Sequence, residues 1–431
     1  MKFKIIVFMS LAAILFACQS DSDELVVENP SSNNEQEEEL PAFILRQDIE
    51  LTAVEHQLAG QNNTFAFNLL KTVYASQKDD NQNILLSPLS ATLAFSMLNN
   101  GAAGTTGEEV RQTLGFGNVS NEIINNYAHK VVSVMQILDP RAVFESANSI
   151  WIQTDFPVFN AFKQVNKQYY NAEIQNVDFS EPATVKLINN WANDKTHGKI
   201  PEILKEIDPS TVLMLGNALY FKGYWMEPFM KEYTTDAAFR TSNGSEQMVP
   251  MMRKSSRISH YAKLENCAAL ELPFGNSAFS LVVVLPDEDT DISAVVDQMD
   301  GDWWAQVIMG LESPPYNLEV RMEIPRFKLA YERTLNNDLM AMGMQTPFAK
   351  AADFSLISQV PLFVSQVLQK TFVQMNEDGM EAAAVTIIQM AGDSGIQFIP
   401  VDFKVNRPFL YFLKEKSTGL VFFVGVMNQI T

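Results

Sequence analysis

The chain has 431 residues and a formal net charge of −20, with 31 lysines and arginines against 51 aspartates and glutamates. This balance argues against nucleic acid, anionic membrane surfaces and heparin-like polyanions as partners, because such partners need basic patches and no run of lysine or arginine occurs. The length and the apolar content of 47% are those of a globular protein with a sizeable core.

The first 17 residues are typical of an export signal. Lys2 and Lys4 precede an apolar run, 5–17, that is too short to span a bilayer. The run ends in LFAC, which resembles the lipobox of bacterial lipoproteins. That resemblance implies that Cys18 becomes the mature N-terminus and carries the lipid. We therefore predict a lipoprotein signal peptide over 1–17, with ordinary secretion as the alternative.

The next segment, 18–45, is acidic. Its part from 19 to 40 holds eight acidic residues and no basic one. It has too little apolar surface to offset its ordering entropy, so we predict a disordered tether that holds a domain over 46–431 away from the outer membrane. The acidic residues after Cys18 resemble the surface-export signals of Bacteroidetes-type lipoproteins. That resemblance implies a lipid-anchored protein on the cell surface; a soluble extracellular or periplasmic protein is the alternative.

The remaining chain mixes helical and strand patterns without a second linker. Helical spacing occurs over 61–77 and 105–116, and Ser87 with Pro88 has the form of a helix start that follows a short strand. Because helices and strands do not alternate in a steady βαβ rhythm, we predict an α+β fold with large antiparallel or mixed sheets. The clearest predicted strands are 147–153, 212–223, 278–286 and 317–329.

The sequence Gly-Asp-Ser-Gly at 392–395 resembles the serine nucleophile of a trypsin-like protease. Such an enzyme needs a histidine base in an Ala-Ala-His-Cys setting and a second glycine where Ile396 stands. The chain has four histidines, His56, His129, His197 and His260, and none lies in that setting. The second glycine is also missing, because position 396 is an isoleucine. No His or Cys pair has metal-ligand spacing, and the glycines at 101–107 lack the lysine of a phosphate-binding loop. We therefore predict a protein that is not an enzyme and needs neither metal nor cofactor.

Several longer motifs occur together and in order. They are NILLSPLSATLAFSMLNNGAAGTTGEEVRQTLGF (83–116), LMLGNALYFKGYWMEPF (213–229), AADFSLIS (351–358), VQMNEDGMEAAA (373–384), FKVNRPFLYFL (403–413) and TGLVFFVGVMN (418–428). These segments resemble the serpin family of protease inhibitors over nearly all of residues 50–431. The resemblance implies a monomer with the serpin fold, which has three β-sheets, eight to nine helices and an exposed reactive-centre loop, here about 377–402.

The resemblance also implies a mechanism, suicide inhibition of serine endopeptidases and of cysteine endopeptidases with the same acyl chemistry. The target cleaves the exposed loop and is trapped as an acyl-enzyme, while the cleaved loop inserts as a new strand into the central sheet. The hinge of this loop would be Glu377, Gly379, Met380, Glu381, Ala382, Ala383, Ala384 and Thr386. A polar patch beneath the sheet would comprise Ser87, Ser90, Asn217 and Gln369, with Gln369 in place of a common histidine.

The residues 380–391 suit a strand as well as a loop. The segment contains no proline, and its side chains alternate between two faces. One set is uncharged and small near its start, as a core-facing set must be. The other contains Glu381, the only charge among the twelve. Met380 is larger than the usual threonine, which predicts slower insertion. The small residues 382–384 argue against the alternative, a non-inhibitory serpin that acts as a binding or storage protein or as a simple protease substrate.

The predicted reactive bond joins Asp393 to Ser394, because the residue before that bond lies sixteen residues after the hinge glutamate, Glu377, in most inhibitory serpins. An aspartate there predicts a target with a basic pocket, like that of granzyme-B-like or caspase-like proteases. A bond shifted by one residue would present Gly392 or Ser394 instead and suit elastase-like enzymes. Cleavage after Met390 would suit chymotrypsin-like or subtilisin-like enzymes and shorten the inserted strand.

Overall fold

The computed structural model describes residues 41–77, 81–208, 210–257, 260–380 and 397–431. The predicted lipidation site Cys18, the reactive bond Asp393–Ser394 and the hinge from Glu381 to Thr386 lie outside the described residues. The predicted tether overlaps the described chain at 41–45. There the Arg141 side chain donates to the Pro41 carbonyl over 2.8 Å, and its guanidinium lies 5.7 Å from the centre of the Phe43 ring. These two contacts attach the last residues of the predicted tether to Arg141, although residues 42–48 are exposed.

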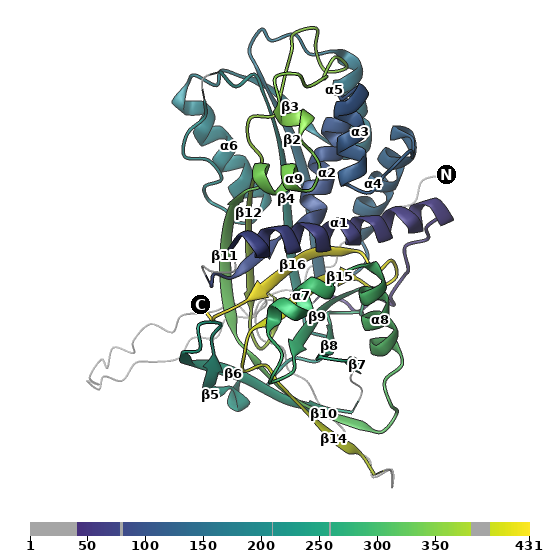
Figure 1. The fold of residues 1–431 in the computed structure, drawn as a ribbon, viewed down its shortest axis with the longest axis vertical. Helices are drawn as coiled ribbons and strands as arrows, with labels where there is room; N and C mark the ends of the chain where they lie inside the picture. Colours follow the sequence, from purple (N-terminus) through teal and green to yellow (C-terminus); the bar gives the residue numbers. More distant parts are fainter. Residues whose placement is uncertain (1–40, 78–80, 209, 258–259, 381–396) are drawn as a thin grey trace, which may run out of the picture. The chain divides into compact units, whose positions relative to one another are not determined.

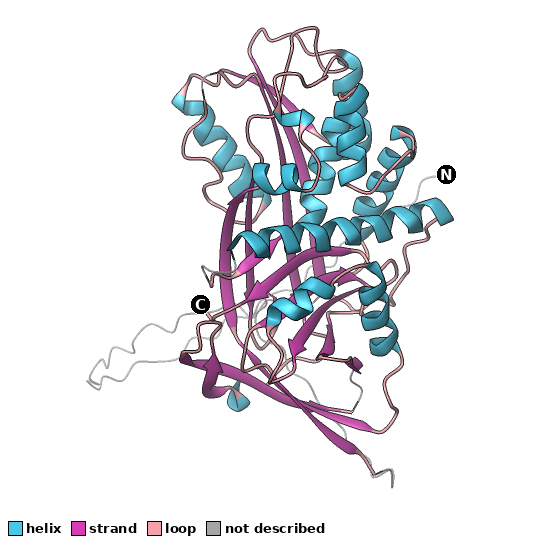
Figure 2. Cartoon of the chain, in the orientation of Figure 1, coloured by secondary structure: helices cyan, strands magenta, loops and turns pink. Residues whose placement is uncertain are grey.

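The described residues form nine α-helices and three β-sheets, so the predicted α+β class with three sheets and eight to nine helices is confirmed (Figures 1 and 2). Helix α1 crosses the middle of the view in Figure 1, and α6 packs on one face of a long central sheet. None of the described helices has the length and apolar content of a membrane span. The helices are α1 (Ala53–Gln77), α2 (Pro88–Asn99), α3 (Gly104–Thr113), α4 (Asn121–Met135), α5 (Asn160–Tyr170), α6 (Pro182–Lys195), α7 (Ile292–Gln298), α8 (Gly301–Glu312) and α9 (Asn336–Ala341).

The first sheet, here called the central sheet, has six strands and mixes parallel and antiparallel pairs. Strands β2 and β3 are parallel, and the other neighbours are antiparallel. The third strand in its spatial order, β13, is only two residues long and lies between two much longer strands, β12 and β4. In spatial order the strands are β11 (Phe327–Thr334), β12 (Leu368–Met375), β13 (Gly379–Met380), β4 (Leu213–Tyr224), β2 (Ala142–Gln153) and β3 (Glu173–Val177).

The second six-stranded sheet, here called the core sheet, carries most of the deep apolar interior. Every residue of β9, β15 and β16 is buried. The third sheet has four strands, β14 (Ile399–Lys404), β10 (Leu318–Pro325), β6 (Glu246–Ser256) and β5 (Thr235–Arg240). The core sheet contains β1 (Ile84–Leu86), β16 (Val421–Met427), β15 (Phe409–Glu415), β9 (Phe279–Pro286), β8 (Cys267–Pro273) and β7 (His260–Lys263).

Local signals explain where several elements begin. Ser87 caps α2, where its hydroxyl accepts from the Ser90 amide over 3.4 Å and Pro88 takes the first turn, as predicted. Helix α1 begins eight residues before the predicted start at 61, because Thr52 and Glu55 form a capping box at its N-terminus. The predicted strand 317–329 divides at Arg326 into β10 and β11, which belong to different sheets.

Candidate functional site

The chain enters the central sheet through a tight turn between β12 and β13. The Asn376 amide donates to the Gly379 carbonyl over 2.9 Å, and the Asn376 side chain accepts from the amides of Asp378 and Gly379. Gly379 has a φ of +151°, and a Cβ there would overlap the carbonyl oxygen of Gly223 on β4. Glycine is therefore required at this hinge position, and Met380 follows it into the sheet.

The turn is held by the segment that follows β4. The Trp225 indole donates to the Asn376 carbonyl over 3.0 Å, and the Trp225 amide donates to the Asp378 carbonyl over 2.9 Å. The Phe229 amide donates to the Glu377 carbonyl over 2.8 Å. These bonds satisfy three backbone acceptors of the turn, so the start of the hinge is fixed by both main chain and side chain.

Two ion pairs also hold the turn between β12 and β13. The buried Glu377 carboxylate lies 3.5 Å from Arg326 at the break between β10 and β11, and the buried Asp378 carboxylate lies 3.3 Å from Lys231. Residues 377–380 are buried, and β14 begins at Ile399, so the loop predicted over 377–402 is not exposed throughout. The physical reason is that both ends of the predicted loop pair with neighbouring strands.

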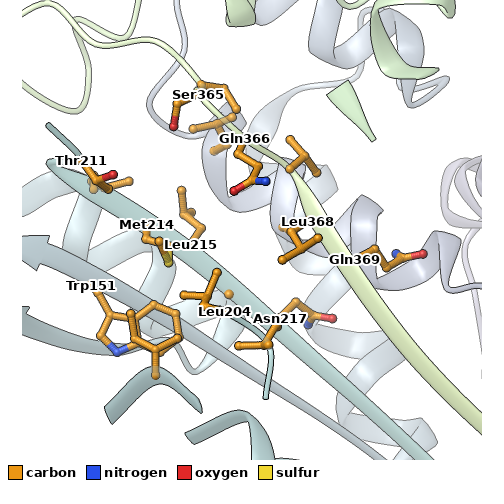
Figure 3. A pocket seen from close by; sticks show the side chains of 18 of the residues that line it. Trp151, Leu204, Thr211, Met214, Leu215, Asn217, Ser365, Gln366, Leu368 and Gln369 are labelled. Carbon is orange, nitrogen blue, oxygen red and sulfur yellow. The ribbon is translucent and has the colours of Figure 1, made fainter. Parts of the chain in front are cut away.

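Beyond Met380, strands β4 and β12 are separate. The described residues contain no pairing between them, and the space between them is part of a cavity of about 630 Å³, here called the slot. Figure 3 shows Met214 and Leu215 from β4 along one side and Leu368 and Gln369 from β12 along the other. Two long strands of one sheet therefore present facing edges with room between them, which is an acceptor for a further strand.

The floor of the slot is polar at one level. Gln369 makes two hydrogen bonds to Ser87 at the start of α2: its amide donates to the Ser87 carbonyl over 2.8 Å, and its oxygen accepts from the Ser87 amide over 3.0 Å. The Ser87 hydroxyl donates to the Phe422 carbonyl of the core sheet over 3.1 Å. Gln369 thus links the central sheet to the core sheet through Ser87 and its cap on Ser90.

Asn217 has different partners from those of the other three polar residues. Its amide donates to Asn148 over 2.8 Å and to Ser146 over 3.2 Å, both on β2. Its side-chain oxygen is buried and has no hydrogen-bond partner among the described residues. The structure therefore brings Ser87, Ser90 and Gln369 together but directs the Asn217 amide toward β2. Asn217 and Gln369 both line the slot, from opposite strands (Figure 3).

Sequence reasoning missed the residues that hold the hinge. Arg326 and Lys231 contact Glu377 and Asp378 from 51 and 147 positions away in the chain, and no local pattern marks either residue as a partner. Trp225 lies within a motif on which the family resemblance was based, and that tryptophan was the one residue in the sequence that could have indicated a contact with the hinge.

Cys267 is separate from the hinge and the slot. It is buried, and burial raises the pKa of its thiol to about 11, so the thiol is unreactive.

Comparisons with known proteins agree with this geometry. The family model described as "Serpin (serine protease inhibitor)" matches residues 60–430. Serpin B6 of Pongo abelii is 34% identical over 378 residues, which cover 85% of this chain and 98% of that protein. The leukocyte elastase inhibitor of Homo sapiens is 33% identical over 382 residues, 86% of this chain and 98% of that protein.

A solved structure has a similar fold. The native state of tengpin, a thermophilic serpin, aligns with a TM-score of 0.77 and 31% identity over 90% of this chain and 96% of that chain. The family model matches well over half of the chain, and both relatives are more than 30% identical to it. The chain therefore belongs to the serpin family.

Proposed function

We propose that this serpin is a suicide inhibitor of serine endopeptidases, and of cysteine endopeptidases that form the same acyl intermediate. The observation that carries the proposal is the position of β13. It occupies the first two places of the slot, with Gly379 opposite Tyr224 and Met380 opposite both Gly223 and Met375. The remaining length of β4 and β12 is available to the residues that follow Met380 once cleavage releases them.

Extending this register assigns each loop residue that follows Met380 a neighbour on β4 and a neighbour on β12. Position 386 lies six residues beyond Met380 and falls between Asn217, six before Gly223, and Gln369, six before Met375. The core-facing set, which begins at Met380 and takes every second residue, then lies on the buried face of β12. The buried residues of β12 on that face are Gln369, Thr371, Val373 and Met375. In this position the Thr386 hydroxyl is a donor for the buried Asn217 oxygen that lacks a partner.

The energy of insertion supports trapping. Twelve residues that each gain about 0.5–1.5 kcal/mol per net hydrogen bond contribute about 6–18 kcal/mol, before apolar burial is added and ordering entropy is subtracted. A typical domain is stable by about 5–15 kcal/mol, so strand insertion is large enough to distort a tethered protease. The small side chains at 382–384 favour this use over a non-inhibitory binding or storage role.

For the target class we propose Asp393–Ser394 as the reactive bond, with a protease whose pocket is basic. The relative named leukocyte elastase inhibitor supports the alternative, in which Gly392 or Ser394 enters the pocket of an elastase-like enzyme. No lysine or arginine occurs between Glu377 and Asp402, so trypsin-like proteases find no residue to cleave after in this segment.

The test is incubation of the full chain with a protease panel that contains granzyme-B-like, caspase-like, elastase-like, chymotrypsin-like and trypsin-like enzymes. We expect a denaturant-resistant complex with at least one, cleavage within 388–396 by mass spectrometry, and a marked rise in the unfolding temperature of the cleaved chain. Cleavage that yields neither a complex nor a more stable product identifies a non-inhibitory serpin and refutes the proposal.

We also propose that Cys18 is acylated and that the protein is anchored to the outer membrane, on the basis of the LFAC motif and the acidic segment that follows it. Intact-mass measurement of protein extracted from native membranes should show a chain that starts at Cys18 with the mass of the added lipid. An unmodified chain with another N-terminus refutes the anchor and leaves a soluble secreted protein.

A further inference from the structure

One lysine of the third sheet lies on the core-facing side of its strand. Lys254 is on β6, and its neighbours on the same face are Met252, two residues earlier, and Met322, its partner on β10. Both methionines are buried, so Lys254 occupies a position on an apolar face. Its side chain keeps 16% of its surface exposed. Lysine is seldom found in such a position, because its ammonium group loses most of its hydration there.

The amine of Lys254 contacts the segment that follows β4. Its Nζ donates to the Glu227 carbonyl over 2.5 Å and lies 4.8 Å from the centre of the Phe229 ring. The Glu227 carboxylate is 3.9 Å from Nζ and half-exposed, which is too far for a direct hydrogen bond. Burial lowers the pKa of Lys254 to about 8, although the charge of Glu227 raises it. A desolvated lysine amine of this kind is a nucleophile near neutral pH.

The segment that Lys254 contacts is also the one that holds the hinge turn. Phe229 is buried, and its amide donates to the Glu377 carbonyl over 2.8 Å. The Phe229 ring meets the Trp225 ring edge-on, with ring centres 6.4 Å apart, and Trp225 donates to two carbonyls of the turn. Lys254 therefore supports, from the third sheet, the residues that fix the start of the hinge.

We propose that Lys254 is a modification site for small uncharged electrophiles such as isocyanic acid, and that its modification loosens the hold on the hinge turn. The lone pair of Nζ attacks the isocyanate carbon, so an N–C bond forms and the C=N π electrons move to the isocyanate nitrogen. That nitrogen takes a proton from Nζ, and the product is a urea, with no group lost and no change of oxidation state. The urea is uncharged, so the cation beside the Phe229 ring and the Glu227 carboxylate is lost. The inference does not depend on the inhibitory function proposed above.

The test is cyanate labelling of the full chain at about pH 7.5, followed by peptide mapping with mass spectrometry. Lys254 should react about tenfold faster than N-acetyl-lysine in the same solution, because more of its amine is neutral at that pH. Its rate should stop rising above about pH 8.5, whereas the rate of N-acetyl-lysine continues to rise. Lys186, which is exposed on α6, is the internal reference and should react more slowly than Lys254. Equal reaction of Lys254 and Lys186 would refute the site.

Hydrogen exchange tests the effect on the hinge turn. After labelling, a peptide that covers 225–231 should exchange about two- to tenfold faster, and a peptide that covers β9 should be unchanged. Lys254→Arg keeps a cation but has no amine that reacts with cyanate, so labelling should leave exchange of 225–231 unchanged in that variant. This control also accounts for labelling of Lys231, which contacts Asp378. If labelling alters exchange equally in wild type and Lys254→Arg, or alters it in neither, modification of Lys254 does not loosen the hinge turn.

Discussion

The central sheet and the core sheet have the same number of strands, but they differ in how fully their inner strands are paired. In the core sheet the neighbours β16, β15, β9 and β8 pair with one another along their length, and β9, β15 and β16 are buried throughout. In the central sheet, among the described residues, β13 pairs with β4 at two residues and with β12 at one, and the slot of about 630 Å³ adjoins the remainder of these two strands. The interior of the core sheet has no place for another strand, whereas the central sheet has a place for one.

This difference separates the source of stability from the source of function. The core sheet holds the domain together through packed aromatic and aliphatic side chains, which lose contacts if anything moves. On the facing edges of β4 and β12, the only strand that the described residues supply is the two-residue β13, and in the proposed mechanism further pairing forms after cleavage. Substitutions in the two sheets should therefore act differently on the intact and the cleaved protein.

The largest effect is expected at Ala384. The register places position 384 between Leu219 and Thr371 on the buried face, so Ala384→Arg would bury an unpaired charge at a cost of several kcal/mol. We expect this variant to be cleaved as a substrate without forming a denaturant-resistant complex. The measurement is the ratio of complex to cleaved product after reaction with a protease that wild type traps.

Ala383 provides the matched control. It is next to Ala384 in sequence but faces the outer side of the sheet, with Phe372 and Tyr220 as its neighbours in the same register. Ala383→Arg should retain most of the complex, because its charge stays in contact with solvent. Equal loss of complex in the two variants would show that the alternation of faces assigned to the loop is wrong.

Phe422 tests the core sheet. It is fully buried in β16 and packs against Phe144 and Phe221 of the central sheet, with ring centres 5.5 and 5.2 Å away. Phe422→Ala should lower the free energy of unfolding by about 3–5 kcal/mol, through lost burial and the cavity left behind. Denaturant unfolding should show a similar loss in the intact and the cleaved protein. A loss confined to one form would contradict the division between the two sheets.

Sequence reasoning predicted these regions unequally. The apolar run of β9 and the Ser87–Pro88 helix start are local signals, and both elements form where they were predicted. The position of Gly379 followed from the family motif. The Glu377–Arg326 pair and the hydrogen bonds of Asn217 to β2 join residues far apart in the chain. Such contacts depend on how strands are ordered in a sheet, which local patterns do not specify.

Glu271 gives the core sheet a pH-dependent component. Burial alone would raise the pKa of Glu271, but the ammonium groups of Lys414 and Lys416, 2.8 and 2.9 Å away, outweigh burial and hold it at about 2. A carboxylate whose folded pKa lies below its ordinary value of 4.5 stabilises the fold above that pH and loses this contribution as the pH falls toward 2.

The variant Glu271→Gln should therefore be less stable than wild type by about 3 kcal/mol at pH 7, and the difference should shrink between pH 4.5 and pH 3. Urea unfolding of both proteins at a series of pH values measures it, and carboxylates that the two proteins share cancel in the comparison. If the difference in unfolding free energy between the two proteins stays constant down to pH 3, Lys414 and Lys416 do not lower the pKa of Glu271.

The smallest effect is expected at Leu215, and it tests most directly how far the cleaved loop enters the slot. In the intact protein Leu215 is half-buried and borders the slot, so Leu215→Ala removes few contacts and should cost about 1 kcal/mol or less. In the cleaved protein the register places Ile388 beside it, and the same substitution should cost about 2–3 kcal/mol. Ile150→Ala is the control, because Ile150 lies on β2, is fully buried and does not line the slot. Unfolding of intact and cleaved protein should thus show a larger loss on cleavage for Leu215→Ala and equal losses for Ile150→Ala. Equal losses at Leu215 would mean that the loop does not reach this depth in the slot.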